Sequence, residues 1–79
     1  MSDLNIYLGQ ILRKYRNERG LNQEELAFQS DLDRTYISLL ERGKRNPTIK
    51  TLFILCSVLD ISPELIIKEL QTKVLERDF

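Results

Sequence analysis

The 79-residue chain carries 12 Lys and Arg against 12 Asp and Glu and has no His, so its formal net charge is zero and its length corresponds to one domain, residues 1–79. A composition of 42% hydrophobic and 30% charged residues is typical of a globular protein, and the single Cys excludes a disulfide framework and a Cys-rich metal site. Without His, Ser-His and Cys-His catalysis are excluded within the chain, which disfavours an enzyme.

The first predicted helix runs from about residue 5 to residue 19. Its apolar residues recur at the spacing of one helix face: Leu8, Ile11, Leu12 and Tyr15. Gly20 follows at the position where helices commonly end. Gly9 lies inside this helix, where glycine costs up to about 1 kcal/mol relative to alanine. Two interpretations fit: another helix approaches Gly9 closely, or the first turn is frayed.

Two short helices are predicted next, over residues 23–30 and about 34–42, joined by the three-residue turn 31–33. Asn22 and Glu25 form a capping-box pattern at the first of them, and Asp33 is expected to cap the second, which ends at Gly43. Four apolar residues would form the small core that fixes the crossing angle, with Ala27 allowing close approach: Leu26, Leu32, Ile37 and Leu40. This pattern indicates a helix-turn-helix unit, with an ordinary helical hairpin as the alternative.

Two longer helices complete the pattern. After a polar loop at 44–47, a fourth helix begins at Thr48 and extends to about residue 59, and Ser62-Pro63 starts a fifth that extends to about Leu75. The inward residues are expected to be Leu52, Leu55, Cys56 and Leu59 in the fourth helix, and Leu65 and Ile66 in the fifth. Cys56 is interpreted as a core residue rather than a redox sensor. The prediction is an all-α fold of five helices.

Four segments carry a resemblance to a known family: LGQILR at 8–13, GLNQEELA at 20–27, DRTYIS at 33–38 and ERGKRNPT at 41–48. They resemble the phage-repressor-like, XRE-type helix-turn-helix family. The resemblance implies a five-helix, lambda-repressor-like DNA-binding domain with its helix-turn-helix at about 23–42. It also implies that Glu41 pairs with an arginine of the first helix, here Arg13. Asp31 stands where the family usually has Gly, and Asp tolerates left-handed backbone better than most residues.

Within that family, the string at 33–38 followed by ERG and RN resembles the controller proteins of bacterial restriction–modification systems. These are small dimers that bind an operator ahead of their own gene and the endonuclease gene. The resemblance therefore implies a transcriptional regulator of this kind.

The base-reading residues are expected at the start of the third helix, because a recognition helix enters the major groove by its N-terminal end. They are Arg34, Thr35, Tyr36 and Ser38. Arg34 can bond guanine O6 and N7 together, or it can pair instead with Asp31 or Glu41. Leu39 also faces outward and is either a further apolar base contact or a plain surface residue.

The residues expected to contact the DNA backbone follow an uneven charge distribution. Residues 13–50 hold nine basic and six acidic residues, a net charge of +3, whereas residues 51–79 hold three and five, a net charge of −2. The basic run at 42–50 directly follows the recognition helix, which favours phosphate neutralisation over a merely solvated face. The helix N-terminus at Gln23 also suits a phosphate. The predicted backbone contacts are Gln23, Arg42, Lys44, Arg45, Asn46 and Thr48.

Apolar residues left over after one core is filled predict a homodimer. They are Phe53, Ile54, Val58, Ile67, Leu70 and Val74, of which the first five are assigned to the dimer interface. A small domain cannot cover this many large apolar groups, and such a patch usually marks a partner surface. A two-fold dimer through the fourth and fifth helices would set the recognition helices about 34 Å apart and require inverted-repeat half-sites.

The sequence thus predicts a cytoplasmic, sequence-specific regulator that binds double-stranded operator DNA as a homodimer, without cofactor, metal or small-molecule ligand. The alternative is a phage-type or antitoxin-type repressor whose main partner is a protein; its mark would be an extended tail, for which only about residues 71–79 are available. No membrane contact is expected, since no apolar run approaches the roughly 20 residues of a span and residues 1–5 lack a signal-peptide pattern.

Overall fold

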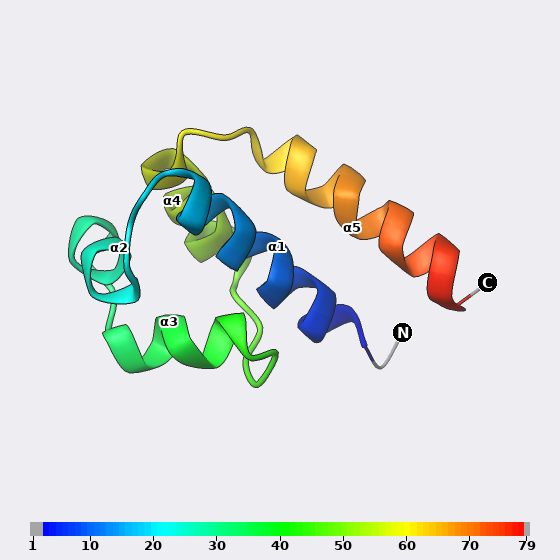
Figure 1. Cartoon of the computed structure of the whole chain (residues 1–79), viewed down its shortest axis with the longest axis horizontal. Helices are drawn as coiled ribbons and strands as arrows, with labels where there is room; N and C mark the ends of the chain where they lie inside the picture. Colours follow the sequence, from blue (N-terminus) through cyan, green and yellow to red (C-terminus); the bar gives the residue numbers. More distant parts are fainter. Residues whose placement is uncertain (1–2, 79) are drawn as a thin grey trace.

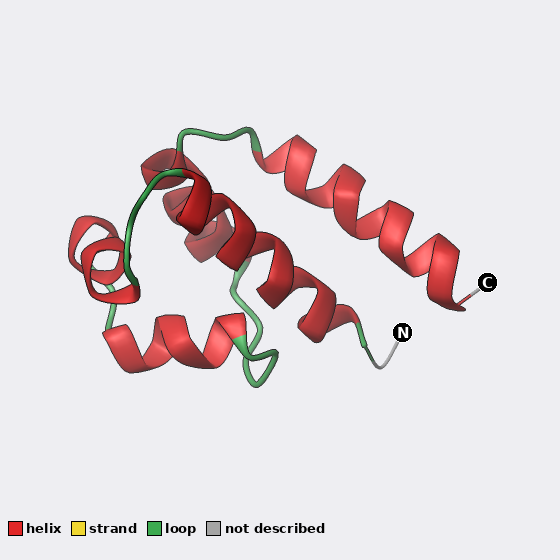
Figure 2. Ribbon diagram, in the orientation of Figure 1, coloured by secondary structure: helices red, strands yellow, loops and turns green. Residues whose placement is uncertain are grey.

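The computed structural model describes residues 3–78, which form five helices and no strand. In chain order they are α1 (Leu4–Glu18), α2 (Gln23–Ser30), α3 (Arg34–Glu41), α4 (Ile49–Leu59) and α5 (Pro63–Asp78) (Figures 1 and 2). The predicted fold class and helix order are confirmed. Residues 1, 2 and 79 lie outside the described residues, and with them part of the segment on which the signal-peptide expectation rests.

The ends of the two short helices depend on the predicted capping residues. Asn22 Oδ1 accepts a hydrogen bond from the Glu25 backbone N–H at 2.7 Å, and Glu25 Oε1 accepts one from the Asn22 N–H at 2.9 Å. Asp33 Oδ1 accepts from the Thr35 N–H at 2.8 Å. Each cap satisfies a backbone donor that the helix itself leaves unpaired. Asp31, between the helices, has the left-handed conformation expected where the family has Gly, with φ 57°.

α1 lies at the centre of the arrangement. It packs against α3 on one side and against α5 on another, while α2 contacts both α3 and α4 (Figure 1). Every helix contributes to one apolar core, whose most completely buried large side chains are Leu26, Ile37, Leu55, Leu59 and Ile66. Cys56 is 1% exposed and belongs to this core, as predicted, and its burial raises the pKa of the thiol. Within residues 3–78, no helix combines the length and the apolar character needed to cross a lipid bilayer.

The close approach predicted as one interpretation of Gly9 is confirmed, and the frayed first turn is wrong. A Cβ atom at Gly9 would lie 2.5 Å from the carbonyl oxygens of both Leu40 and Glu41, at the C-terminal end of α3. Only a residue without a side chain lets the two helices come this near. Gly9 therefore fixes how closely α3 lies against α1.

α5 differs from the prediction in two ways. It continues to Asp78 instead of ending near Leu75, because no Gly or Pro interrupts it. The segment from residue 71 considered above as an extended tail is therefore helical through Asp78. Its buried face is also rotated from the predicted one. Leu65 is 40% exposed, whereas Val74, predicted to be left over, is 7% exposed. Ile66, Leu70 and Val74 follow each other at intervals of four residues, so they share one face, and Leu65 lies outside it.

Candidate nucleic-acid interface

The N-terminal end of α3 presents its predicted base-reading side chains to solvent. Arg34 and Thr35 are exposed, Tyr36 and Ser38 are half-buried, and Ile37, which faces the core, is 1% exposed. Within residues 3–78 Arg34 forms neither an ion pair nor a hydrogen bond, so the alternative in which Asp31 or Glu41 holds it is not observed. Its guanidinium is therefore available to a ligand.

Tyr36 joins the recognition helix to the basic loop that follows it. The guanidinium carbon of Arg45 lies 5.7 Å from the centroid of the Tyr36 ring, within the range of a cation–π contact. Tyr36 itself packs against the core, which limits how far its ring can move. Tyr36, a predicted base contact, and Arg45, a predicted phosphate contact, therefore lie beside each other.

The other predicted backbone contacts lie on the surface between α3 and α4. Arg42, Lys44 and Asn46 are exposed, and Arg42 Nε makes a long hydrogen bond of 3.4 Å to the Ser38 carbonyl. Thr48 is exposed as well, but its hydroxyl caps α4, accepting from the Thr51 N–H at 3.1 Å and donating to Thr51 Oγ1 at 3.0 Å. The DNA-contacting roles of these residues stay predictions.

A buried ion pair joins the first three helices. Arg16 Nε lies 2.6 Å from Glu41 Oε2 and Arg16 Nη2 lies 2.9 Å from Glu41 Oε1, a bidentate pair between α1 and α3. Arg16 Nη1 also donates to the Leu21 carbonyl at 2.7 Å, and the side-chain amide of Gln23 donates to Glu41 Oε1 at 3.0 Å. These bonds satisfy the buried charges and hold the start of α2 beside the end of α3.

The prediction that Glu41 pairs with Arg13 is wrong. Arg16 follows Leu12 by four residues, so it lies on the buried face of α1, whereas Arg13 is exposed. The signal was present in the sequence as a cation placed on the apolar stripe of the first helix. Gln23 opens α2 as predicted, and its side-chain amide donates one of its two N–H groups to Glu41.

Arg13 has another place in the structure, which sequence reasoning missed. It lines a polar hollow with Arg34 at the N-terminal end of α2, completed by Arg16, Asn22, Gln23 and Glu24. The unpaired backbone N–H groups and positive dipole end of a helix attract negative charge. Two exposed guanidinium groups beside that helix end give this part of the surface a positive character.

The residues predicted to form the dimer interface do not all share one face. Phe53 is 57% and Ile67 49% exposed, whereas Ile54, Val58 and Leu70 are half-buried. On α4, Ile54 and Val58 lie four residues apart on one stripe, and Phe53 lies on another. On α5, Ile67 and Leu70 line a shallow, mainly apolar hollow with Leu4, Gln71 and Val74.

Comparison with known proteins places this geometry among helix-turn-helix proteins. The sequence profile of the family described as "Helix-turn-helix" matches residues 12–66. The control protein C.SmaI of Serratia marcescens is 44% identical over 68 residues, which span 85% of this chain and 81% of that protein.

Two solved structures resemble the fold as well as the sequence. The restriction-modification controller protein C.AhdI of Aeromonas hydrophila superposes with a TM-score of 0.77 at 44% identity, covering 84% of this chain and 98% of that one. The controller protein C.Esp1396I, solved as a tetramer in complex with its natural 35 base-pair operator, gives a TM-score of 0.79 at 40% identity over 91% and 95% of the two chains.

Proposed function

This chain belongs to the helix-turn-helix family, and on that premise we propose that it is a sequence-specific, DNA-binding transcriptional regulator that acts in the cytoplasm by binding rather than by catalysis. More narrowly, we propose a controller protein that binds an operator upstream of its own gene and of a restriction endonuclease gene. The observation that carries the proposal is the exposed N-terminal end of α3, where Arg34 has no ion pair or hydrogen bond to any residue from 3 to 78. The narrower part is supported by the similarity to the control proteins, and a methyltransferase gene and an endonuclease gene beside this one would test it.

The arrangement suits a recognition helix in the major groove. Arg34 can donate two hydrogen bonds to the O6 and N7 atoms of one guanine, and the Thr35 methyl or the Tyr36 ring can contact a thymine methyl. Arg45, beside Tyr36, and the other basic residues at 42–50 would neutralise phosphates on either side. Direct contacts of α3 then supply sequence discrimination, and the basic loop supplies affinity.

The proposal includes a homodimer formed through α4 and α5. Exposed Phe53 and Ile67, with the hollow beside Ile67, leave apolar surface that a second copy of the chain can cover. A two-fold axis there would set two recognition helices one turn of DNA apart. The alternative repressor whose main partner is a protein has less support, since α5 remains helical through Asp78 and offers no extended tail as far as that residue.

Replacing Arg34 with alanine tests base reading. We expect a loss of about 1–3 kcal/mol in binding to the cognate operator and relaxed discrimination at one base position, because a bidentate contact to guanine is removed. The measurement is the dissociation constant for cognate and scrambled duplexes at a fixed salt concentration. Lys44→Ala is the matched control: it also removes one positive charge, from an exposed residue of the basic loop, and should weaken both duplexes alike. Equal losses on both duplexes for Arg34→Ala would show that Arg34 contacts only the backbone.

Replacing Ile67 with glutamate tests the dimer. We expect a monomer at tens of micromolar in sedimentation analysis, since an unpaired carboxylate would have to be buried in an apolar interface. Phe28→Glu serves as the control, because Phe28 is 86% exposed on α2, which is not one of the two helices of the proposed interface, and its replacement should leave the dimer intact. A wild type that sediments as a monomer, or an Ile67→Glu variant that stays dimeric, would refute this interface.

A further inference from the structure

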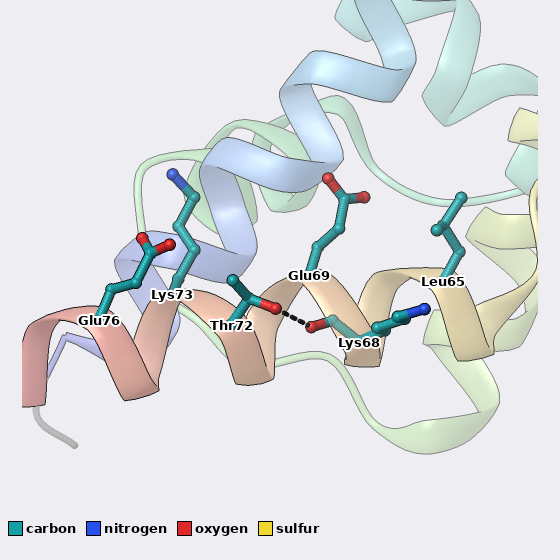
Figure 3. Close-up of a pocket in the computed structure, with 6 residues that line it drawn as sticks. All are labelled: Leu65, Lys68, Glu69, Thr72, Lys73 and Glu76. Carbon is teal, nitrogen blue, oxygen red and sulfur yellow. Dashed lines mark hydrogen bonds between the residues drawn. The ribbon is translucent and has the colours of Figure 1, made fainter. Parts of the chain in front are cut away.

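A carboxylate on α5 receives hydrogen bonds from two consecutive residues of α1. Lys14 Nζ donates to Glu69 Oε1 and Tyr15 Oη donates to Glu69 Oε2. Figure 3 shows the Glu69 side chain extending from α5 toward the neighbouring helix. Burial by itself would raise the pKa of Glu69, but the hydrogen bonds from Lys14 and Tyr15 and the positive charges of Lys14 and Lys73 together lower this pKa below its ordinary value. We call this group of three residues the α1–α5 clamp.

The clamp restrains motions that apolar packing limits only loosely. Ile66 and Val74 attach α5 to the rest of the molecule through buried apolar contacts, at 0% and 7% exposure. Burying this face sets the approximate roll of α5, but apolar contacts are non-directional and restrain small rotations and axial shifts along α1 less tightly. Hydrogen bonds are directional, and a carboxylate held by two donors at different positions on α1 fixes both.

The clamp and the proposed dimer surface lie on opposite flanks of α5. Glu69 follows Ile67 by two residues, a rotation of about 200° around a helix. Fixing the roll of α5 at Glu69 therefore fixes the direction in which Ile67 and its hollow face outward.

A second rigid connection runs from α1 to the recognition helix. Gly9 lies against the carbonyl groups at the end of α3, and Arg16 holds Glu41 through two hydrogen bonds. A continuous path therefore leads from α3 through α1 and the clamp to α5. In a two-fold dimer, this path would determine the distance and angle between the two recognition helices.

We propose that Glu69 is a positioning residue that sets the operator half-site spacing this protein accepts, an inference that rests on the proposed function. One inserted base pair rotates the second half-site by about 34° and moves it by about 3.4 Å. A dimer detects such a change only if its two recognition helices are rigidly placed. The clamp supplies that rigidity from outside the DNA-contacting surface.

The test compares Glu69→Ala with Glu76→Ala, an identical replacement on the same helix at an exposed residue without a hydrogen bond or ion pair within the described part of the chain. The probes are duplexes with two inverted copies of the half-site that the wild type selects from a randomised pool, at the selected spacing and with one base pair added or removed. The readout is the ratio of dissociation constants between the altered and selected spacings.

For the wild type and Glu76→Ala, we expect altered spacing to weaken binding about tenfold or more, comparable to a mismatched base pair. For Glu69→Ala the ratio should fall to about threefold or less, with affinity for a single half-site unchanged. Tyr15→Phe, which removes one donor without changing charge or shape, should give an intermediate ratio, and it decides the question if Glu69→Ala does not fold.

Three outcomes count against the proposal, and they are distinguishable. A wild-type spacing ratio in both Glu69→Ala and Tyr15→Phe would overturn the role of the clamp while leaving the proposed function intact. An equal loss of affinity on every duplex, single half-site included, would show a purely structural role for Glu69. A wild type that selects no inverted repeat would overturn the proposed dimeric regulator and this inference together.

Discussion

Replacing Glu41 with alanine is expected to lower the free energy of unfolding by about 3–5 kcal/mol, because it leaves the charge of Arg16 buried without its partner. The side chains of Arg16 and Glu41 are only 9% and 3% exposed, and their two hydrogen bonds join α1 to α3. A domain of this length has a total stability of about 4–12 kcal/mol, so this loss is a large share of it. Urea unfolding followed by circular dichroism measures the change.

A double replacement separates loss of the pair from loss of folding as such. Arg16→Met combined with Glu41→Leu removes both charges and fills their volume, so it should recover most of the stability lost in Glu41→Ala. Glu24→Ala, at an exposed position on α2, should change stability by no more than about 0.5 kcal/mol. If Glu41→Ala were as mild as Glu24→Ala, the ion pair would have no structural importance.

Replacing Gly9 with alanine is expected to destabilise the protein by about 1–3 kcal/mol, although alanine is the better helix former. Helix propensity alone favours this replacement by up to about 1 kcal/mol. The new Cβ, however, would lie 2.5 Å from two backbone carbonyl oxygens of α3, and the backbone has to move to relieve the overlap. A rise in the melting temperature would show that helix propensity dominates, and a fall would show that the overlap with α3 dominates.

Gln10→Ala is the matched control for this helix, because Gln10 is the exposed neighbour of Gly9 and its replacement adds no contact with α3. Its stability should stay within about 0.5 kcal/mol of the wild type. A Gly9→Ala variant that melts at or above the wild-type temperature would show that α3 shifts without cost. In that case the close packing of α1 on α3 would not restrain the recognition helix.

The helices and their ends were predictable from sequence because they depend on neighbouring residues. The capping box of Asn22 and Glu25 and the cap at Asp33 each join atoms no more than three residues apart, so the pattern contains both partners. The left-handed turn at Asp31 depends on the backbone preference of one residue. The exposed position of Arg34 and Thr35 followed from the period of α3, which places Ile37 and Leu40 inward.

Pairings between distant residues were decided by the tertiary structure. The partner of Glu41 is Arg16 and not Arg13, because packing selects the arginine on the buried face of α1 from two cations only three residues apart. The inward face of α5, with Val74 buried and Leu65 exposed, depends on how that helix lies along α1. Glu69 gives no sequence signal, since its partners Lys14 and Tyr15 are 55 and 54 residues away. Sequence alone determined this protein's helices and caps, because those interactions are local, while only the packed fold determined its long-range polar contacts, because they depend on the relative rotation of whole helices.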